Sequence, residues 1–430
     1  MSKLQELINK LCPNGVEFKP LGEVFEMRNG YTPSKNNPDF WEGGTIPWFR
    51  MDDIRENGRI LSDSIQHITP SAIKGKGLFE ANSFILATTA TIGEHALIIA
   101  DSLANQQFTN LKVRKSLSNL LVTKFIYYYL FIVDDFCKRN TNVSGFASVD
   151  MDKLKKMPFP VPPIEVQEEI VRILDSFSDY AAELQAELQA RKQQYEYYRN
   201  LLLTFNPSAY GCGTDDEQKD GVTTWGGHNY KIQWKKLGDV FEMRNGYTPS
   251  KNNSEFWVGG TIPWFRMDDI RENGRILSDS IQHITPSAIK GKGLFEANSF
   301  ILATTATIGE HALIIADSLA NQRFTNLKVR KSLSNLLVTK FIYYYMFIVD
   351  DFCKKNTNVS GFASVDMDKL KRMPFPIPPL ELQEKIASIL DRFETLVNDL
   401  TNGLPAEIAA VKDQYEYYRN KLLTFKKLSA

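Results

Sequence analysis

Two stretches of the chain place apolar residues at alternating steps of four and three positions, the spacing of a coiled-coil helix seam. The first stretch covers 164–205, and a continuous helix of this length would span roughly 63 Å at 1.5 Å per residue. Its seam consists of Ile170, Leu174, Phe177, Ala181, Leu184, Leu188, Arg191, Tyr195, Tyr198, Leu202 and Phe205. The second stretch runs from Leu380 to Phe425, and Gly403 and Pro405 predict a kink or break within it.

Shorter patterns of other kinds precede each long stretch. Residues 83–100 are rich in Ile, Thr, Ala and Leu around one Gly, which predicts short strands joined by a turn. Residues 117–138 repeat apolar positions at helical spacing and predict a buried helix. Residues 151–163 predict a short helix or turn and then an extended segment, because residues before Pro avoid the helical conformation. Together these patterns indicate an α+β globular domain.

The globular pattern occurs twice. Residues 21–160 return as 237–376, with eight differences in 140 positions and therefore 132 identities. The differences are Glu23/Asp239, Pro38/Ser254, Asp39/Glu255, Glu42/Val258, Gln107/Arg323, Leu130/Met346, Arg139/Lys355 and Lys156/Arg372. Two copies this similar must share one fold, so the chain is a tandem duplication. The motif QYEYYRN closes both long stretches at an offset of 220 instead of 216, so the second stretch holds four extra residues.

A long apolar seam cannot remain exposed to water, and two such helices in one chain can bury their seams by pairing. The predicted fold class is α+β: two near-identical globular domains joined by two long antiparallel helices with pseudo-two-fold symmetry. The predicted boundaries are 1–160 for the first domain, 161–205 for the first helix, 206–230 for a flexible linker, 231–376 for the second domain and 377–430 for the second helix. The alternative is that each seam packs on its own globular domain.

Composition narrows the class of protein. The 51 Lys and Arg residues balance 51 Asp and Glu residues, so no bulk positive charge points to nucleic acid. An apolar fraction of 43% is sufficient for real cores. No run approaches the roughly 20 apolar residues of a membrane span, and the start lacks the apolar core of a signal peptide. Four Cys without CxxC spacing argue against a disulfide framework and a zinc site. A cytoplasmic protein with no membrane association is expected.

Signatures of catalysis are missing from the sequence. The glycines and lysines of Ile73–Glu80 lack the GxxxxGKS/T spacing of a phosphate-binding loop and are interpreted as a solvated turn. No GxGxxG motif follows a predicted strand. The N/D-P-P-Y/F motif of amino-methyltransferases is also absent. These observations favour a recognition protein over an enzyme.

Histidines and paired carboxylates are the residues of the sequence that could bind a metal ion. The candidates are His67, His95, His283 and His311, and the pairs Asp52–Asp53 and Asp134–Asp135. No histidine has a Cys or carboxylate at metal-ligand spacing, so structural or surface roles are expected. A turn or helix-surface role is also expected for the Asp pairs, which could otherwise hold Mg²⁺. We therefore expect no metal site and no catalytic residue.

Each globular domain concentrates side chains suited to base edges and phosphates on segments that have the composition of loops. Arg matches guanine and Asn or Gln matches adenine in the major groove, while small hydroxyls and backbone amides hold phosphates. Tyr31 and Trp48 could equally be core residues. The predicted DNA-binding residues are Arg28, Tyr31, Lys35, Arg50, Thr88, Thr89, Thr91, Gln106 and Gln107, with Arg244, Tyr247, Lys251, Arg266, Thr304, Thr305, Thr307, Gln322 and Arg323 in the second copy.

The chain resembles the specificity (S) subunits of type I restriction–modification systems. The matching motifs are GYTPSK and FWEGGTIPWFRMDDI, then ILATTATIGEHALI and ANQQFTNL. The first and third are identical in the two copies, and the second and fourth each differ at one position. A Pro-Pro-x-x-x-Gln-x-x-Ile junction then precedes each long helix, and QYEYYRN closes it. The resemblance covers essentially the whole chain, in the family's order of head, helix, head and helix.

The resemblance implies a DNA sequence-recognition subunit without catalytic activity of its own. Each globular domain is then a target-recognition domain that binds one half of a bipartite double-stranded DNA site, and the helices fix the spacer between the halves. The implied partners are two modification (methyltransferase) subunits and the motor/nuclease restriction subunits. S-adenosylmethionine is expected on the methyltransferase, which methylates adenine at N6 after flipping the base, and no cofactor is expected on this chain. Tyr195, Tyr198, Tyr415 and Tyr418 are candidates for the helix seam or the methyltransferase interface.

Two further hypotheses follow. Near-identical, inverted domains predict an inverted-repeat target, and Gln107/Arg323 is the difference most apt to disturb that symmetry. The repeated tetrad AELQ in 182–190 predicts that removing four residues shortens the spacer, unless the tetrads are simply good helix-forming sequence. The alternatives from other classes are a protein- or glycan-binding scaffold that uses its duplicated domains for avidity, and a self-sufficient nucleic-acid enzyme.

Overall fold

A computed structural model describes residues 3–75, 77–142, 147–205, 221–225, 227–358, 363–398 and 403–428. The chain divides into two compact units. The first unit comprises Met1–Gln185 and Glu407–Ala430, and the second comprises Ala186–Ala406. Each unit therefore combines one globular domain with segments of long helix that come from both repeats. We call residues 17–161 the first head and 228–377 the second head.

The first head is built around two sheets. Its elements are β1 (Glu17–Pro20), α2 (Leu21–Val24), β2 (Phe25–Asn29), η1 (Pro38–Phe40), β3 (Ile46–Phe49), α3 (Met51–Asn57), β4 (Ile60–Leu61), β5 (His67–Ile68), η2 (Pro70–Ala72), β6 (Ser83–Ala87), β7 (His95–Ile98), β8 (Leu103–Ala104), β9 (Phe108–Val113), η3 (Lys115–Leu117), α4 (Thr123–Arg139), β10 (Thr141–Asn142), β11 (Ser148–Val149), α5 (Met151–Lys156) and β12 (Pro158–Val161). The larger sheet has the strand order β2-β9-β6-β7-β4, and a smaller one has the order β5-β3-β8. Strand β1 pairs with β12, so the two ends of the head lie together.

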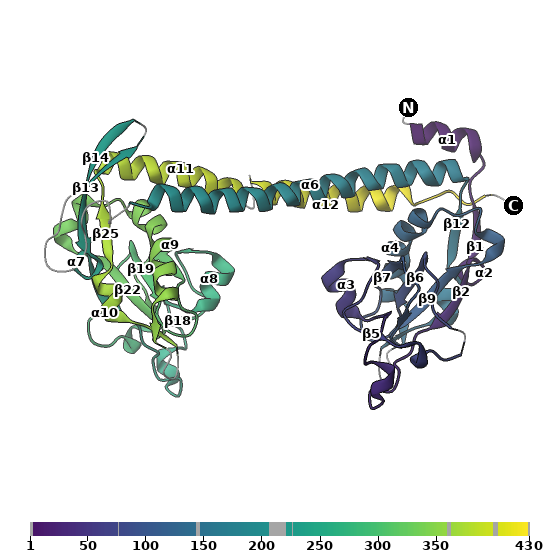
Figure 1. The fold of residues 1–430 in the computed structure, drawn as a ribbon, viewed down its shortest axis with the longest axis horizontal. Helices are drawn as coiled ribbons and strands as arrows, with labels where there is room; N and C mark the ends of the chain where they lie inside the picture. The colour runs from purple at the N-terminus through teal and green to yellow at the C-terminus, as the bar shows by residue number, and fades with distance from the viewer. Residues whose placement is uncertain are drawn as a thin grey trace. The chain divides into compact units, whose positions relative to one another are not determined.

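Strand β6 shows why its sequence is apolar at every position. Phe84 and Leu86 contact the core beneath α4, whereas Ile85 and Ala87 belong to the core shared with the small sheet. Successive side chains of a strand point to opposite faces, and both faces of this sheet are covered. Figure 1 shows α4 on one side of the larger sheet of the first head. The predicted strand–turn–strand over 83–100 and the predicted helix over 117–138 are confirmed, the helix starting later, at Thr123.

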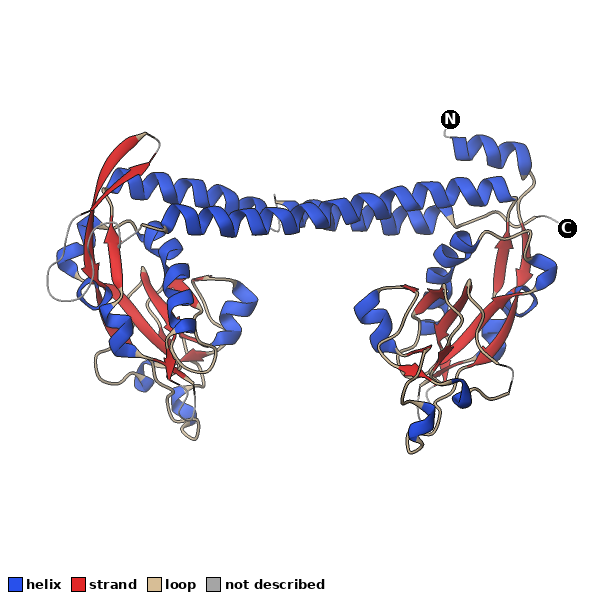
Figure 2. Cartoon of the chain, in the orientation of Figure 1, coloured by secondary structure: helices blue, strands red, loops and turns tan. Residues whose placement is uncertain are grey.

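The second head repeats this arrangement (Figure 2). Its elements are β14 (His228–Lys236), α7 (Leu237–Val240), β15 (Phe241–Asn245), η5 (Ser254–Phe256), β16 (Ile262–Phe265), α8 (Met267–Asn273), β17 (Ile276–Leu277), β18 (His283–Ile284), η6 (Pro286–Ala288), β19 (Ser299–Ala303), β20 (His311–Ile314), β21 (Leu319–Ala320), β22 (Phe324–Val329), η7 (Lys331–Leu336), α9 (Thr339–Lys355), β23 (Thr357–Asn358), β24 (Ser364–Val365), α10 (Met367–Arg372) and β25 (Pro374–Ile377). The larger sheet has the equivalent order β15-β22-β19-β20-β17. The predicted duplication of one α+β fold is confirmed.

Each head is preceded by a different additional element. Helix α1 (Lys3–Leu11) precedes the first head, whereas strand β13 (Gly221–Trp225) pairs with β14 before the second. Part of the predicted linker 206–230 is therefore wrong, because 221–225 form one strand of a hairpin. Residues 206–220 lie outside the described part of the chain. In the first unit, Lys3 of α1 forms an ion pair of 2.8 Å with the buried carboxylate of Glu169.

The long helices are α6 (Ile164–Leu203), α11 (Leu380–Asn398) and α12 (Leu404–Leu422). Helix α6 ends two residues before the predicted Phe205. A helix starting at Leu404, with Pro405 in its first turn, agrees with the break predicted at Gly403 and Pro405; residues 399–402 are outside the described ranges.

Within the first unit, α6 and α12 run antiparallel. Phe177 stacks on Tyr418 with ring centroids 5.4 Å apart, and Tyr180 donates a hydrogen bond of 2.8 Å to Glu407. Within the second unit, Tyr198 of α6 stacks on Phe393 of α11 at 5.9 Å. The seams thus pack helix against helix in both units, as the predicted fold requires.

Each head also packs against the end of the long helix from the other repeat. In the first unit, Phe425 lies 6.2 Å from Phe125 of α4, and the Arg419 guanidinium lies 4.4 Å above the Phe131 ring. In the second unit, Phe205 lies 6.3 Å from Phe341, and Arg199 lies 4.2 Å above Phe347. The two repeats have therefore exchanged their helix ends, and each head depends on a segment far away in sequence.

A buried glutamine fixes the start of each long helix to its own head. Gln167 is fully buried, accepts a hydrogen bond of 2.8 Å from the Val122 amide, and donates bonds of 2.7 Å to the carbonyls of Leu120 and Pro162. Gln383 makes the corresponding three bonds in the second unit. Because a buried amide must have partners, this residue sets the direction in which the helix leaves the head. The Pro-Pro-x-x-x-Gln-x-x-Ile motif thus has a structural reason.

Candidate nucleic-acid interface

Most of the predicted DNA-binding residues lie at one end of the larger sheet of each head. In the second head, β15 ends at Asn245, which pairs with Thr325 near the start of β22, and β19 ends at Ala303, which pairs with Phe324. The loops that follow β15 and β19 and the loop that precedes β22 therefore leave the sheet at the same end. The first head has the same register, with Asn29 opposite Thr109.

Hydrogen bonds hold these loops together. In the first head, the Tyr31 amide donates to the Ala104 carbonyl at 2.9 Å, and the Thr88 amide donates to the Gln107 carbonyl at 2.9 Å. The Thr32 hydroxyl donates to the side-chain oxygen of Gln106 at 2.5 Å. These bonds join residues 31–32, Thr88 and residues 104–107 into one surface. Gln106 is exposed on this surface.

Arg50 borders the same surface at the start of α3. Its amide donates to the buried carboxylate of Asp53 at 2.6 Å, and Asp53 also accepts the Ile65 amide at 2.6 Å. The amide of Asn105, next to Gln106, donates to the Phe49 carbonyl at 3.0 Å, which brings the loops together. About a third of the Arg50 side chain is exposed, and its guanidinium lies 3.9 Å from the carboxylate of Asp52.

Several predicted contact residues already have intramolecular partners. Thr88 is buried, and its hydroxyl lies 2.9 Å from that of Thr109. The Tyr31 hydroxyl donates to the Ala72 carbonyl at 3.0 Å, and Arg28 donates to the Leu78 carbonyl at 2.6 Å. Thr304, Tyr247 and Arg244 repeat these bonds in the second head. These residues shape the surface, and the burial of Thr88 and Thr304 argues against a direct contact with a base.

The remaining predicted residues are accessible to differing degrees. Lys35, Gln106, Lys251, Gln322 and Arg323 are exposed, whereas Gln107, Thr89, Thr91, Thr305 and Thr307 are partly exposed. The loop after β6 contains Ala90 with φ of 64°, and its counterpart Ala306 has φ of 66°. A left-handed Ala costs energy, and such strain is common where a loop must present side chains to a ligand.

Two of the eight differences between the copies change the net charge of a head. Gln107 becomes Arg323 in the loop before β22, and Glu42 becomes Val258 two residues after η1. Val258 is 75% exposed. Both changes make the second head more positive.

A buried histidine–aspartate pair lies in the core beneath this end of the sheet. Nδ1 of His95 lies 2.7 Å from Asp134, and Arg59 approaches the same carboxylate at 3.3 Å. His311, Asp350 and Arg275 form the equivalent group. The sequence has no carboxylate at metal-ligand spacing from His95, but α4 brings Asp134 to β7 from 39 residues away. His67 likewise has Asp63 at 2.6 Å on the surface.

In each pair of adjacent aspartates, one residue is buried and hydrogen-bonded and the other is exposed. Neither pair therefore forms a shared metal-binding site. Asp53 caps α3 and Asp134 binds His95, whereas Asp52 and Asp135 are exposed. Across the described ranges, no group of three His, Cys, Asp or Glu side chains could hold a metal ion. In the same residues, no helix is long and apolar enough to cross a membrane.

The four predicted seam tyrosines divide by position. Tyr195 is buried against the second head, and burial raises its pKa. Tyr415 packs against the first head, with its ring centroid 6.4 Å from that of Tyr128. Tyr198 and Tyr418 stack on the facing helix and remain partly exposed. The neighbouring residues Tyr197 and Tyr417 are the most exposed tyrosines of these helices, at 64% and 60%.

The duplicated heads and paired helices, with a polar loop surface on each head, define a class of protein that presents two equivalent recognition surfaces. Comparison with known proteins identifies the family. Residues 13–191 and 230–410 match the type I restriction modification DNA specificity domain. The chain belongs to this family, and the resemblance seen in the sequence is confirmed.

Relatives match along nearly the full length of the chain. The specificity subunit of the type I restriction enzyme EcoprrI from Escherichia coli is 36% identical, covering 96% of this chain and 94% of its own. A second Escherichia coli type I specificity subunit is 32% identical, covering 99% and 98%. The chain is thus a DNA specificity subunit of a restriction–modification complex.

Solved structures show the same fold. A chain from a study of complex assembly and conformational transition in a type I restriction–modification system has a TM-score of 0.63 at 17% identity, covering 96% of this chain and 98% of its own. The HsdS subunit from Thermoanaerobacter tengcongensis has a TM-score of 0.53 at 17% identity, covering 96% and 97%.

Proposed function

We propose that each head binds one half of a bipartite double-stranded DNA site, and that the two halves are related as an inverted repeat. The observation that carries this proposal is the identity of the two loop surfaces. Of the predicted contact positions, only Gln107/Arg323 differs between the heads. Identical side chains on identical folds select the same bases, so each half-site should have the same sequence read from its own side.

We further propose that the long helices fix the spacer between the half-sites. Helix α6 is continuous over 40 residues and contains the repeated tetrads of 182–190. Deleting Ala182–Gln185 removes about 6 Å of helix, comparable with one to two base-pair steps of 3.4 Å. The deletion is expected to change the spacer and leave both half-sites unchanged. A spacer of unchanged length would contradict the ruler role.

The chain is proposed to direct methylation without performing it. Two methyltransferase subunits would bind S-adenosylmethionine and methylate adenine at N6, and motor/nuclease subunits would join for cleavage. Because the substrate is chromosomal DNA, the proposal places the chain in the cytoplasm. The exposed Tyr197 and Tyr417 occupy equivalent positions on α6 and α12, which suits the docking of two identical partners.

The docking surface is tested by co-purification with the methyltransferase. Replacing Tyr197 and Tyr417 with Ala is expected to reduce retention of the methyltransferase, because exposed aromatic side chains commonly anchor interfaces. Lys192→Ala, an exposed change on the same helix, serves as the matched control. Equal retention by the tyrosine and lysine variants would exclude these tyrosines as anchors.

The proposed function itself is tested by mixing the purified chain with its methyltransferase, labelled methyl donor and a random DNA library. Methylated, sequence-specific products are expected only when both proteins are present. Methyl transfer by the chain alone would favour the self-sufficient enzyme. No specific DNA retention by any mixture would favour a scaffold that binds protein or glycan.

A further inference from the structure

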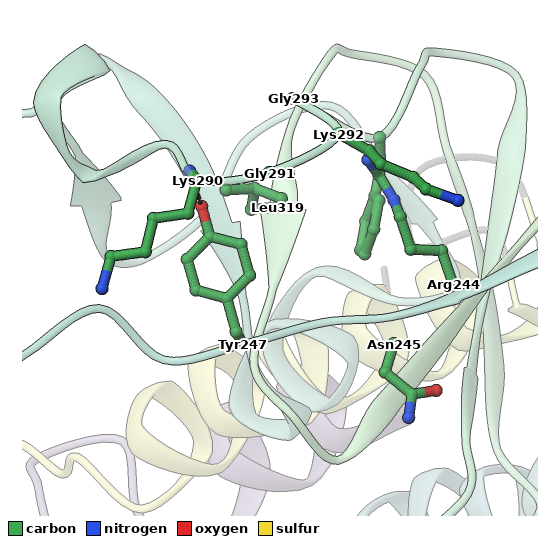
Figure 3. Close-up of a pocket in the computed structure, with 9 residues that line it drawn as sticks. Arg244, Asn245, Tyr247, Lys290, Gly291, Lys292, Gly293 and Leu319 are labelled. Carbon is green, nitrogen blue, oxygen red and sulfur yellow. Dashed lines mark hydrogen bonds between the residues drawn. The ribbon is translucent and has the colours of Figure 1, made fainter.

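A basic pocket opens beside the loop surface of the second head. Its lining residues are Arg244, Asn245, Tyr247, Lys290, Gly291, Lys292, Gly293, Phe295 and Leu319, and its volume is about 230 Å³. Figure 3 shows Arg244 and Lys292 on one side of the opening and Tyr247 and Lys290 on the other. At about 30 Å³ per water molecule, the space equals roughly eight waters, which suits a small polar group.

Two side chains from the end of β15 and the loop after it hold the far wall of the pocket. The Tyr247 hydroxyl accepts the Lys290 amide at 2.7 Å and donates to the Ala288 carbonyl at 3.1 Å. Arg244 donates to the Leu294 carbonyl at 2.6 Å and lies 4.7 Å from the centre of the Phe295 ring. The segment between these anchors is thereby held in place at both ends.

The anchored segment consists of Gly291, Lys292 and Gly293. Both glycines have left-handed φ angles, of 64° and 76°. Their amides and that of Lys292 donate to no other described residue. Successive unpaired amides in a turn of this kind form a concave surface that favours anions.

The charges around the pocket are not balanced. Arg244, Lys290 and Lys292 contribute three cationic groups, and no carboxylate is among the lining residues. Within the part of the chain that the structure describes, neither Lys290 nor Lys292 forms an ion pair. Glu296, whose negative charge acts on Arg244, is paired with Lys328. Partial burial lowers the pKa of Arg244, but an arginine remains protonated at neutral pH.

We propose that this pocket holds one phosphate of the DNA backbone and thereby sets the register of the neighbouring loops on the bases. Tyr247 precedes Thr248, whose hydroxyl is hydrogen-bonded to Gln322, so the pocket adjoins the predicted base-contact loop. Phosphate contacts position a protein on DNA without reading its sequence. This inference rests on the proposed function and assigns residues 290–293, the lysine–glycine loop, a role within it.

The sequence of the first head carries the same residues. Arg28, Tyr31 and Lys74 make the equivalent anchoring bonds, with the Tyr31 hydroxyl accepting the Lys74 amide at 2.7 Å. Lys76 lies outside the described residues. None of the eight differences between the copies falls on a pocket position. The proposal therefore assigns one phosphate to each head.

The test removes the exposed lysines and measures DNA binding against salt concentration. The variant carries Lys74→Ala, Lys76→Ala, Lys290→Ala and Lys292→Ala in the full chain. Loss of one phosphate contact per head is expected to lower the slope of log K against log salt by about 2 in total, since each contact contributes about 0.9. The sequence of the preferred site should remain the same.

A matched control removes four lysines that lie outside the pocket. Lys115→Ala, Lys155→Ala, Lys331→Ala and Lys371→Ala delete exposed lysines of the same heads. A slope that falls no further in the pocket variant than in this control would overturn the proposal, as would a change in the preferred bases. If the wild-type chain binds no specific DNA, the proposed function fails instead, and the two failures are thereby distinguished.

Free anions are the other source of the same chemistry. Calorimetric titration with inorganic phosphate and with a mononucleotide should show no saturable binding to the chain below millimolar concentrations, because one DNA phosphate is bound as part of a larger contact. Tight binding of either probe, lost in the lysine variant, would assign the pocket to a free ligand and overturn the DNA assignment. Equal unfolding temperatures of variant and wild type would show that the substitutions leave the fold intact.

Discussion

The copies 21–160 and 237–376 differ at eight of 140 positions. These differences affect the charge of the heads and leave their fold unchanged. Counting charged side chains, the first copy has 16 basic and 15 acidic residues and the second has 17 and 14, or +1 and +3. The whole difference comes from Gln107/Arg323 and Glu42/Val258, since the other changes conserve charge. Only Leu130/Met346 lies in the core, where the swap conserves volume. The fold is held constant while the net charges of the two heads differ.

The two units differ more near the start of the long helix that leaves each head. Glu169 of α6 binds Lys3 and Arg172 in the first unit, at 2.8 and 2.7 Å. The equivalent position in the second unit is Lys385, which pairs with Glu381 at 2.6 Å. The heads are therefore nearly identical, but the ion pairs at the start of the following helix differ. Substitutions at equivalent positions in the two units can test which interactions are common to both.

The largest effect is expected from removing the second repeat. A chain of residues 1–205 keeps the first head but loses Arg419 and Phe425, which pack on it. Its own Arg199 and Phe205 are the same residue types and pack on an identical surface in the full chain. Two copies are expected to exchange these ends, so light scattering should report twice the monomer mass. Combining Arg199→Ala with Phe205→Ala should weaken this dimer, and a strict monomer would contradict the exchange.

The glutamine junctions should contribute equally to stability in the two units. Gln167→Met leaves the Val122 amide and two carbonyls without their partner, which is expected to cost roughly 3 kcal/mol. Gln383→Met should cost the same, because its three bonds are equivalent. Denaturant unfolding measures both, with the exposed Gln193→Met as the control. Unequal costs would show that the junctions are not equivalent.

The ion pair of the buried Glu169 should make the stability of the first unit depend on pH more strongly than the exposed Lys385–Glu381 pair does in the second unit. Hydrogen bonds from Arg172 and Lys3 lower the pKa of Glu169 to about 2, against 4.5 for a free glutamate. A lowered pKa means that the stabilisation is fully present above about pH 4.5 and is lost as the pH falls toward 2.

Glu169→Gln should therefore reduce the free energy of unfolding by about 1 kcal/mol at pH 7, and by progressively less in acid. Glu381→Gln, which removes an exposed carboxylate of the second unit, is the control and should have little effect. A constant difference between Glu169→Gln and wild type from pH 7 to pH 2 would refute the ion-pair explanation.

The smallest effect is expected from exchanging Arg323 and Gln107, which should change only the salt dependence of DNA binding or one base of the preferred site. Arg323→Gln should lower the salt slope of DNA binding by about 0.9 if Arg323 contacts a phosphate, a change of about 3.5-fold in affinity between 50 and 200 mM salt. Gln107→Arg should raise the slope by the same amount. If Arg323 contacts a base instead, the slope will change little and the preferred base in one half-site will change.

Local patterns in the sequence were sufficient to predict most elements of the fold. The four-three spacing identified the helix seams, and the continuous apolar run of β6 indicated a strand covered on both faces. The hairpin of β13 and β14 was missed, although Gly226–Gly227 between β-branched and aromatic residues is a recognised hairpin signal. Because residues 211–220, just before the hairpin, are rich in Gly and Asp, the whole of 206–230 was predicted as a linker.

Contacts between distant residues could not be predicted in the same way. The exchange of helix ends is invisible in the sequence, because both heads offer the same surface to either helix. Asp134 reaches His95 only through the packing of α4 on β7. Thr88 was chosen for its hydroxyl, yet it continues the buried strand β6 and is bonded within the core. The proposed role of residues 290–293 depends on the hydrogen bonds from Arg244 and Tyr247 that hold this loop, and no local pattern in the sequence indicates those bonds.

Sequencing of modified bases in DNA methylated by the reconstituted complex tests the equivalence of the two heads most directly. The structure predicts one bipartite motif in which the second half is the reverse complement of the first, with at most the position facing Gln107 and Arg323 differing. Two unrelated half-sites would contradict the proposal that both heads read DNA in the same way.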